Sequence, residues 1–341
     1  MSAPHKILII GRNAALAHDL GTMLWPAGLE ARMVDGAEFG LLDIDRLRRN
    51  IDALAPSLII SVVGSASTDR IEHGRTVTQA RNHWAVGDLA EVAGHRDIPL
   101  LHLSSDQVFA GDRLEAYRET DAADAISVLG QSQAAGEAEI RAHCRRHVIL
   151  RTGWLFSANG HNMLRTMISL GRRGGRVHVP HDHVSGPTPV RELCAALRQI
   201  ALRMLETPPA EFGGHTLHFS GAPAATLYEF AEVAIGRAAS FQVAPDLVPI
   251  TPSRFGVTGA PARRTELDCS TATTMFGLIQ PDWRKALADC VDEICQTDGG
   301  TPEQRIAALA ETPLPYRGFV PENRRRGALP FGVAMDRRRV G

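Results

Sequence analysis

Two short segments of this 341-residue chain bear on its chemistry, the first through the polar groups it carries and the second through the titratable groups it lacks. The first, Ser104-Ser105-Asp106, follows the apolar residues Leu100, Leu101 and Leu103, so we expect a buried strand that delivers two hydroxyls and a carboxylate at its C-terminal end. The second begins a predicted helix, in which Leu129 and Gln133 lie four residues apart and share one face. Hydroxyls and carboxylates can hydrogen-bond a polar ligand and take part in proton transfer, whereas leucine and glutamine carry no titratable group.

The motifs around these segments resemble those of the dTDP-4-dehydrorhamnose reductase family, a group of extended short-chain dehydrogenase/reductases. The resemblance covers roughly residues 5 to 295. It rests on short matches in the same order, which include Ser104 to Gly111, Tyr117-Arg118-Glu119, Gly130-x-Ser132, Gly136-Glu137, Leu150 to Trp154, Pro187-Thr188, Ser220-Gly221, Leu267 to Ser270 and Asp282-Trp283-Arg284. Each match alone would be weak, and their common order makes the resemblance specific.

The catalytic residues that this resemblance implies are only partly present. The family pattern is Tyr-x-x-x-Lys with a Thr or Ser on the preceding strand, where the tyrosine protonates a carbonyl as hydride arrives and the lysine lowers its pKa. The matching positions here are Ser105, Leu129 and Gln133. The hydroxyl is kept, but leucine has no proton to give and glutamine has no charge. None of the three tyrosines or two lysines of the chain is placed to replace the missing pair.

Two functions therefore compete. We favour a nucleotide-sugar-binding protein, similar to the dTDP-4-dehydrorhamnose reductases, with impaired or lost reductase chemistry and a binding or regulatory role. The alternative is an active NAD(P)H-dependent reductase of a dTDP-4-keto-6-deoxy sugar or related nucleotide-sugar, with a histidine or water as proton donor.

The resemblance also implies substrate contacts. Ser105, Asp106, Trp154 and Arg263 are expected to bind the substrate, with Trp154 stacked against its sugar or nucleotide end. Arginine suits bidentate phosphate binding, which is the role expected of Arg263. A buried core tryptophan and a solvated arginine are the structural alternatives.

The expected cofactor is NADP or NAD, although the glycine-rich turn that binds its pyrophosphate in the family is altered here. The apolar run from Lys6 to Ile10 leads into Gly11, and alanines at 14 and 17 fill the other two places of the family's G-x-x-G-x-x-G turn. Ala14 puts a methyl group where phosphate should approach, so a turn that serves packing alone is the alternative. Asp35 could accept from a ribose 2′-hydroxyl, or lie solvated in a loop. The expected cofactor contacts are Gly11, Asn13, Ala14, Asp35, Asp43 and Ser65.

Alternating strands and helices predict an α/β protein, with a doubly wound, mostly parallel (Rossmann) sheet and a smaller C-terminal α+β substrate lobe. We assign residues 1–155 to the Rossmann domain, whose sheet can take later strands up to about residue 220. Elements of the lobe at 156–297 interleave with this core. Residues 298–341 form an extension rich in Pro, Arg and Gly, typical of a solvated tail, with a partner-binding arm as the alternative.

Composition narrows the functional classes. Hydrophobic residues make up 44% of the chain, charged residues 22%, and the net charge of −1 gives no overall attraction to nucleic acid or membranes. We expect a cytoplasmic protein with no nucleic-acid or membrane partner, because we find no leader and no long apolar run. His178, His181 and His183 lack acidic or cysteine partners at ligand spacing, so we predict no metal site. A homodimer is left open.

Overall fold

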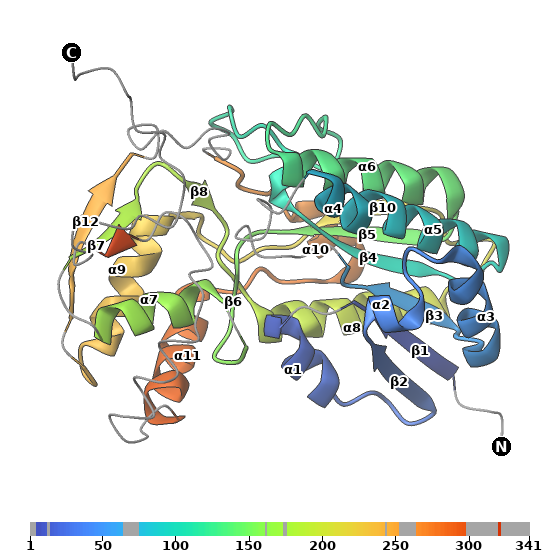
Figure 1. The fold of residues 1–341 in the computed structure, drawn as a ribbon, viewed down its shortest axis with the longest axis horizontal. Coiled ribbons are helices and arrows are strands. Elements are labelled where there is room, and N and C mark those ends of the chain that lie inside the picture. Colours follow the sequence, from blue (N-terminus) through green and yellow to red (C-terminus); the bar gives the residue numbers. More distant parts are fainter. Residues whose placement is uncertain are drawn as a thin grey trace, which may run out of the picture.

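The computed structural model describes residues 5–11, 14–63, 75–160, 162–172, 176–242, 244–251, 264–297 and 320–321. Two parts are evident in Figure 1: a layered α/β part that carries the N-terminus, and a smaller lobe built around α7, α9 and α11. Within the described residues, no helix is both long and apolar enough to cross a bilayer.

A six-stranded parallel sheet forms the centre of the larger part. Its strand order is β10-β5-β4-β3-β1-β2, and every neighbouring pair is parallel. The strands are β1 (His5–Ile10), β2 (Leu29–Val34), β3 (Leu58–Ser61), β4 (Leu100–Ser105), β5 (His147–Thr152) and β10 (His215–His218). The doubly wound parallel sheet predicted from the sequence is therefore confirmed.

Helices cover both faces of this sheet, which explains its unbroken apolar strands. In β1, Ile7 and Ile9 join the core beneath one face, whereas Leu8 and Ile10 join the core beneath the other. Because a strand buried on both sides needs apolar residues at every position, its hydrophobic run is continuous. The first face is covered by α1 (Ala14–Thr22) and α8 (Val190–Glu206), and the second by α3 (Ile44–Leu54), α5 (Ala85–His95) and α6 (Val128–His143).

The smaller lobe has its own apolar core. Phe156, Phe230 and Trp283 are fully buried there, with ring centroids 5.3 and 5.5 Å apart along the chain of contacts. Its main helices are α7 (Met163–Arg172), α9 (Leu227–Ala238) and α11 (Trp283–Thr297). Its strands are β6 (Leu155–Phe156), β7 (Arg176–Pro180), β8 (Val184–Ser185), β9 (Thr188–Pro189), β11 (Ala225–Thr226), β12 (Asp246–Ile250) and β13 (Val320–Pro321).

Between these lobe segments the chain returns to the larger part. Helix α8 and strand β10 both belong to the doubly wound core, although residues of the lobe precede and follow them. After α11, the described pair β13 returns to the lobe and pairs antiparallel with β7. The boundary between the two parts is therefore crossed several times, which brings distant segments together along it.

Candidate functional site

The candidate site lies at the carboxyl edge of the parallel sheet. Strands β4 and β5 end side by side there, with Ser105 paired to Thr152, and Figure 1 shows both strands running toward the lobe segments β6 and β8. Ligands of open α/β sheets bind at this edge, because the loops that leave the strands can open around a crevice. Ser105, Asp106 and Trp154 are the predicted site residues that this edge brings together.

The Ser105 hydroxyl is engaged by the neighbouring helix. It donates a hydrogen bond to Gln133 Oε1 over 2.6 Å, and its oxygen accepts the backbone N–H of Gln107 at 3.2 Å. Gln133 is 6% exposed, and Leu129, one turn earlier on α6, is 7% exposed. A neutral amide and an apolar side chain thus lie at the two positions where the family pattern requires a cation and an acid.

Close packing at the start of α6 fixes this arrangement. Ser127 caps the helix by accepting the Gly130 N–H at 3.0 Å. A Cβ at Gly130 would lie 1.8 Å from the carbonyl oxygen of Gln107, so only glycine allows the helix to approach this closely. Gln107 belongs to the 3₁₀ turn (Asp106–Val108) that follows β4. The glycine therefore sets how near Leu129 and Gln133 come to the end of β4.

Asp106 links the sheet to the lobe. Its Oδ2 accepts the hydroxyls of Ser185 and Thr265, each at 2.5 Å, and its Oδ1 accepts Gln107 Nε2 at 3.1 Å. Burial raises the pKa of this carboxyl, and its hydrogen bonds oppose that shift. Both oxygens are occupied by protein groups, so the geometry favours a linking role. The direct substrate contact expected from the resemblance stays a prediction.

Trp154 follows β5 and is only partly buried, unlike the fully buried core tryptophan Trp283. Its ring centroid lies 6.2 Å from that of His183, with the planes inclined by 60°. Its carbonyl accepts the backbone N–H of Thr188 at 2.6 Å. The indole thus lies at the sheet edge with one neighbouring ring fixed beside it, and contact with a ligand stays a prediction.

A buried ion pair lies one turn further along α6. Glu137 accepts two hydrogen bonds from the Arg151 guanidinium, at 2.9 and 2.6 Å, and both side chains are at most 2% exposed. Burial disfavours the Glu137 carboxylate, but hydrogen bonding and the charge of Arg151 outweigh it and hold its pKa below the usual range. The arginine also lies over the ring of Phe109, 4.9 Å from its centroid. This pair joins α6 to β5 directly below the site.

Gly11 follows β1 directly and lies close to the neighbouring strands. Gly11 has φ of +120°, and a Cβ there would lie 2.8 Å from the carbonyl carbon of Val62. Its N–H donates to the carbonyl of Val34 at 3.2 Å, so Gly11 meets the ends of both strands that flank β1. The helix α1 then begins at Ala14. A glycine turn followed by a helix N-terminus fits the pyrophosphate of a dinucleotide.

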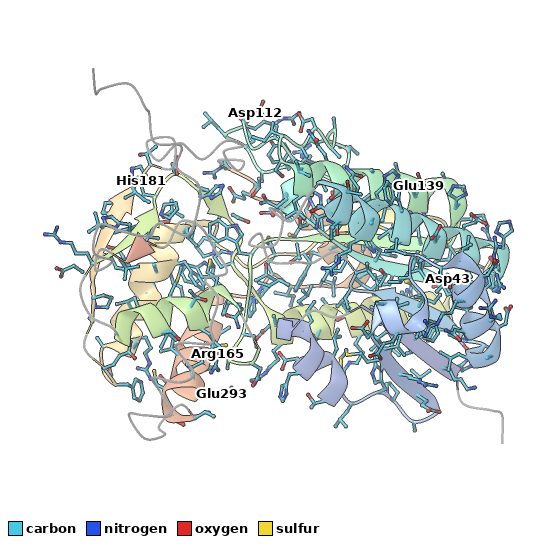
Figure 2. The ribbon with its side chains drawn as sticks, viewed as in Figure 1. Asp43, Asp112, Glu139, Arg165, His181 and Glu293 are labelled. Carbon is cyan, nitrogen blue, oxygen red and sulfur yellow. The ribbon has the colours of Figure 1, made fainter. Side chains whose placement is uncertain are left out.

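The two predicted cofactor carboxylates act as helix caps. Asp35 follows β2 and accepts the backbone N–H groups of Ala37 and Glu38, at 2.9 and 3.4 Å, at the start of α2 (Gly36–Phe39). Asp43 accepts the N–H of Arg46 at 3.0 Å at the start of α3 (Figure 2). Asp35 is thus a helix cap at the end of β2, and its contact with a cofactor stays a prediction. Its position at the carboxyl end of β2 still suits a ribose hydroxyl.

Comparison with known proteins decides the family. A family model described as the RmlD substrate binding domain matches residues 5–296. This chain belongs to the dTDP-4-dehydrorhamnose reductase family. The protein named dTDP-4-dehydrorhamnose reductase in Aggregatibacter actinomycetemcomitans is 30% identical over 287 residues, which cover 83% of this chain and 97% of the relative. The protein of the same name from Escherichia coli K12 is 26% identical, over 86% of this chain and 99% of its own.

Solved structures confirm the fold of this dTDP-4-dehydrorhamnose reductase family member. A dTDP-4-dehydrorhamnose reductase from Clostridium acetobutylicum superposes with a TM-score of 0.76 at 23% identity, covering 84% of this chain and 98% of the other. One from Bacillus anthracis, solved in complex with NADP, gives 0.76 at 24% identity, with 85% and 99% covered.

Several predicted site residues lie outside the described residues. These are Asn13, Ser65 and Arg263, together with nearly all of the extension at 298–341. Sequence reasoning did not find the contacts of Ser185 and Thr265 with Asp106, or the contact of His183 with Trp154. Their partners are far away along the chain, and no local pattern marks them.

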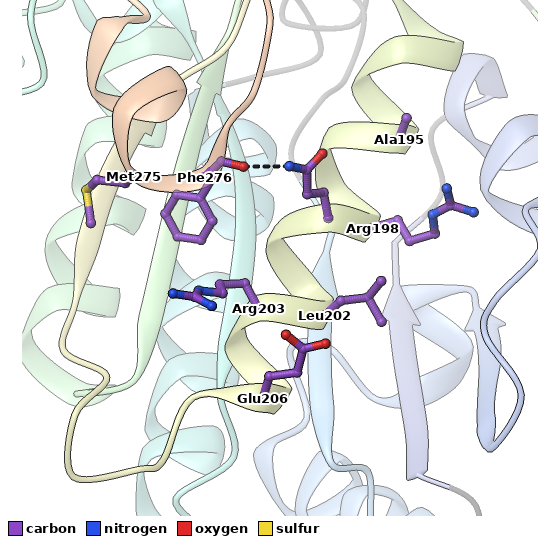
Figure 3. A pocket seen from close by; sticks show the side chains of 8 residues that line it. Ala195, Arg198, Leu202, Arg203, Glu206, Met275 and Phe276 are labelled. Atoms are coloured by element: carbon purple, nitrogen blue, oxygen red, sulfur yellow. Dashed lines mark hydrogen bonds between the residues drawn. The ribbon is translucent and has the colours of Figure 1, made fainter.

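A pocket lies away from this edge, between α8 and α10 (Ser270–Phe276), and Figure 3 shows its lining. Gln199 donates a side-chain hydrogen bond to the carbonyl of Phe276 across it. Its wall combines polar and apolar side chains: Ala195, Arg198, Gln199, Leu202, Arg203, Glu206, Met275 and Phe276. None of the predicted site residues lines it, so it is not the candidate site.

Proposed function

We propose that this protein is a nucleotide-sugar-binding member of the dTDP-4-dehydrorhamnose reductase family that has lost the usual proton-coupled hydride transfer. The observation that carries the proposal is the hydrogen bond from Ser105 to Gln133 Oε1 at 2.6 Å, beside Leu129. These are the positions of the acid and its supporting cation in the family pattern. The role of the protein is then binding or regulatory, and the ordinary reductase turnover is lost.

The chemistry of the three side chains explains the loss. Reducing a ketone needs a hydride for the carbon and a proton for the oxygen. The Ser105 hydroxyl proton is directed at an amide oxygen, and the neutral Gln133 cannot lower the pKa of any neighbouring acid by charge. Leu129 has no proton to transfer. Loss of a positioned general acid removes roughly 10²–10⁴ in rate.

The residues expected to bind substrate and cofactor are better preserved than those expected to catalyse the reaction. Ser105 and Trp154 remain at the sheet edge, and the Glu137–Arg151 pair and the Asp106 link support that edge from below and from the lobe. Gly11, the start of α1 and Asp35 would hold the adenosine and pyrophosphate parts of a dinucleotide. A bound nicotinamide cofactor supplies hydride. Of the described residues at the three catalytic positions of the family pattern, Leu129 and Gln133 carry no acid for the second half of the reaction, and the Ser105 proton is held by Gln133.

An active reductase is the second candidate. A curated relative that carries the reductase name is 30% identical and is covered over 97% of its length, which favours retained chemistry. This candidate needs a proton donor other than Leu129, such as a histidine or a water molecule.

Calorimetry and turnover assays separate the two. We expect dTDP-sugars to bind with micromolar affinity, while NADH and NADPH show no oxidation with a dTDP-4-keto-6-deoxy sugar above about 10⁻³ of the rate of an active relative. Turnover at the relative's rate would establish the reductase instead. Failure of every dTDP-sugar to bind at millimolar concentration would refute the proposed function.

A further inference from the structure

The short strand β8 is held on both sides. It pairs antiparallel with β11, where Thr226 faces Val184, and Val184 also forms a parallel bridge with Arg264. The ladder continues one residue beyond the strand, because the N–H of Leu227 donates to the carbonyl of His183 at 3.0 Å. The backbone from His183 to Ser185 is therefore fixed in an extended conformation between two neighbours.

One face of this extended segment contacts two parts of the candidate site. Residues alternate between faces in a strand, so the side chains of His183 and Ser185 point the same way and Val184 points oppositely. Ser185 donates to Asp106, the residue after Ser105, at 2.5 Å. His183 lies edge-on to Trp154 at a centroid separation of 6.2 Å. A single segment thus connects the end of β4 with the indole that follows β5.

We propose that His183 is a positioning residue that fixes the indole of Trp154 for contact with the sugar part of a bound nucleotide-sugar. This inference rests on the proposed function. His183 is 5% exposed, so it presents little surface of its own to a ligand, whereas Trp154 is only half-buried. The backbone of Trp154 is held by Thr188, but that bond leaves the ring free to turn about its side-chain torsions. The edge-on imidazole restricts those torsions.

Loss of the His183 ring should weaken only the contacts made with the sugar part of the ligand. Edge-to-face ring pairs contribute enough to change an equilibrium by roughly two- to tenfold. If His183 selects the indole orientation that stacks on a sugar, its loss lowers the affinity for dTDP-glucose by about that factor. The affinity for dTDP, which lacks the sugar, stays unchanged. A side chain that only stabilised the fold would affect both ligands equally.

Calorimetric titration of the full-length protein with dTDP-glucose and with dTDP tests this directly. We expect His183→Gln to lose two- to tenfold in affinity for dTDP-glucose alone, and His183→Phe, which keeps a ring edge, to recover most of the loss. His181→Gln is the matched control, because His181 is exposed and lies two residues away. The change in tryptophan fluorescence on binding dTDP-glucose should be smaller in His183→Gln and should recover in His183→Phe. The part of this change that comes from Trp154 is identified by its loss in Trp154→Phe.

The outcomes are distinguishable. Unchanged dTDP-glucose affinity in His183→Gln, or an equal loss for both ligands, would overturn the role of His183 and leave the proposed function standing. No binding of dTDP-glucose to the unaltered protein would overturn the proposed function and this role with it. If His183→Gln does not fold, His183→Asn, with a smaller amide, carries the same comparison.

Discussion

The hydroxyl of Ser105 and the side-chain oxygen of Gln133 lie 2.6 Å apart, joined by a hydrogen bond in which serine is the donor. This direction follows from the chemistry of the two groups, since an amide oxygen can only accept. A lysine at the same position could only donate, and would leave the serine proton available to another acceptor. The identity of residue 133 therefore determines where the proton of Ser105 points.

Restoring both missing groups should create turnover. We expect Leu129→Tyr combined with Gln133→Lys to raise the rate of NAD(P)H oxidation with a dTDP-4-keto-6-deoxy sugar by roughly 10²–10⁴ over the unaltered protein. Each single substitution is the control, and should gain far less because the tyrosine pKa depends on the lysine charge. A double variant that binds the sugar nucleotide yet gains no activity would contradict the view that only chemistry was lost.

Glu137→Gln should destabilise the protein strongly, because it leaves the buried Arg151 charge without its partner. We expect a loss of about 3–5 kcal/mol in the free energy of unfolding, measured by urea titration at pH 7. Glu139→Gln is the control: its side chain lies on the same helix (Figure 2), is 34% exposed, and should cost at most about 0.5 kcal/mol.

The Glu137–Arg151 pair also predicts how the free energy of unfolding depends on pH. The pKa of Glu137 lies below its ordinary value of 4.5 in the folded protein, so its stabilisation is complete above pH 4.5 and is lost as pH falls through the lower folded value. The stability difference between the unaltered protein and Glu137→Gln should therefore narrow below pH 4.5. A difference that stays constant down to pH 3 would contradict this assignment.

His102 should make the protein less stable in mild acid. Burial between strands lowers its pKa from 6.5 to about 4, with the Glu137 charge opposing the shift, and its Nδ1 lies 3.0 Å from Ser61 Oγ. Between those pH values only the unfolded chain gains the proton, so stability falls by up to about 1.4 kcal/mol per pH unit from this group. His102→Asn should flatten the decline measured by urea unfolding between pH 7 and 4.

Gly11→Ala should disrupt the first turn. A Cβ would meet the Val62 backbone at 2.8 Å, and φ of +120° is unfavourable for alanine, so we expect a loss of about 1–3 kcal/mol and weaker dinucleotide binding. Gly21→Ala, in α1 with no atom within 4 Å of the new methyl, should instead stabilise by about 0.5–1 kcal/mol. Equal effects of the two substitutions in thermal unfolding would show that the turn is not constrained.

If a dinucleotide binds, NADH should bind at least about tenfold more tightly than NADPH, because the Asp35 carboxylate at the end of β2 accepts from a ribose hydroxyl and repels a 2′-phosphate. Calorimetric titration with each cofactor measures the ratio. Asp35→Asn should reduce the ratio while keeping an oxygen that can cap α2. A preference for NADPH in the unaltered protein would contradict this role of Asp35.

The sheet was predictable because its signal is local. Continuous apolar runs such as Ile7 to Ile10 specify a strand covered on both faces, and the structure confirms them. The four-residue spacing of Leu129 and Gln133 likewise predicted a shared helix face. The capping role of Asp35 was harder to predict. A carboxylate three residues before Glu38 is typical of a helix N-terminus, but this helix has only four residues, too few to show a periodic pattern.

The partners of Asp106 could not have been found in this way. Ser185 is 79 residues away and Thr265 is 159 residues away, and both reach Asp106 only because the lobe folds back onto the sheet edge. Short polar side chains in loops carry no periodic signal, so their meeting depends on the whole topology. The contact between His183 and Trp154 has the same origin.

Asp106 accepts hydrogen bonds from hydroxyls of two distant segments, whereas positions 129 and 133, which hold the acid and its supporting cation in the family pattern, lie on α6 and take no part in these bonds. The side chains that join the lobe to the sheet edge and the positions of the reactive groups are thus separate sets. Reactivity can therefore be lost, or regained, by changing two positions on one helix turn without altering the hydrogen bonds that hold the lobe to the sheet edge.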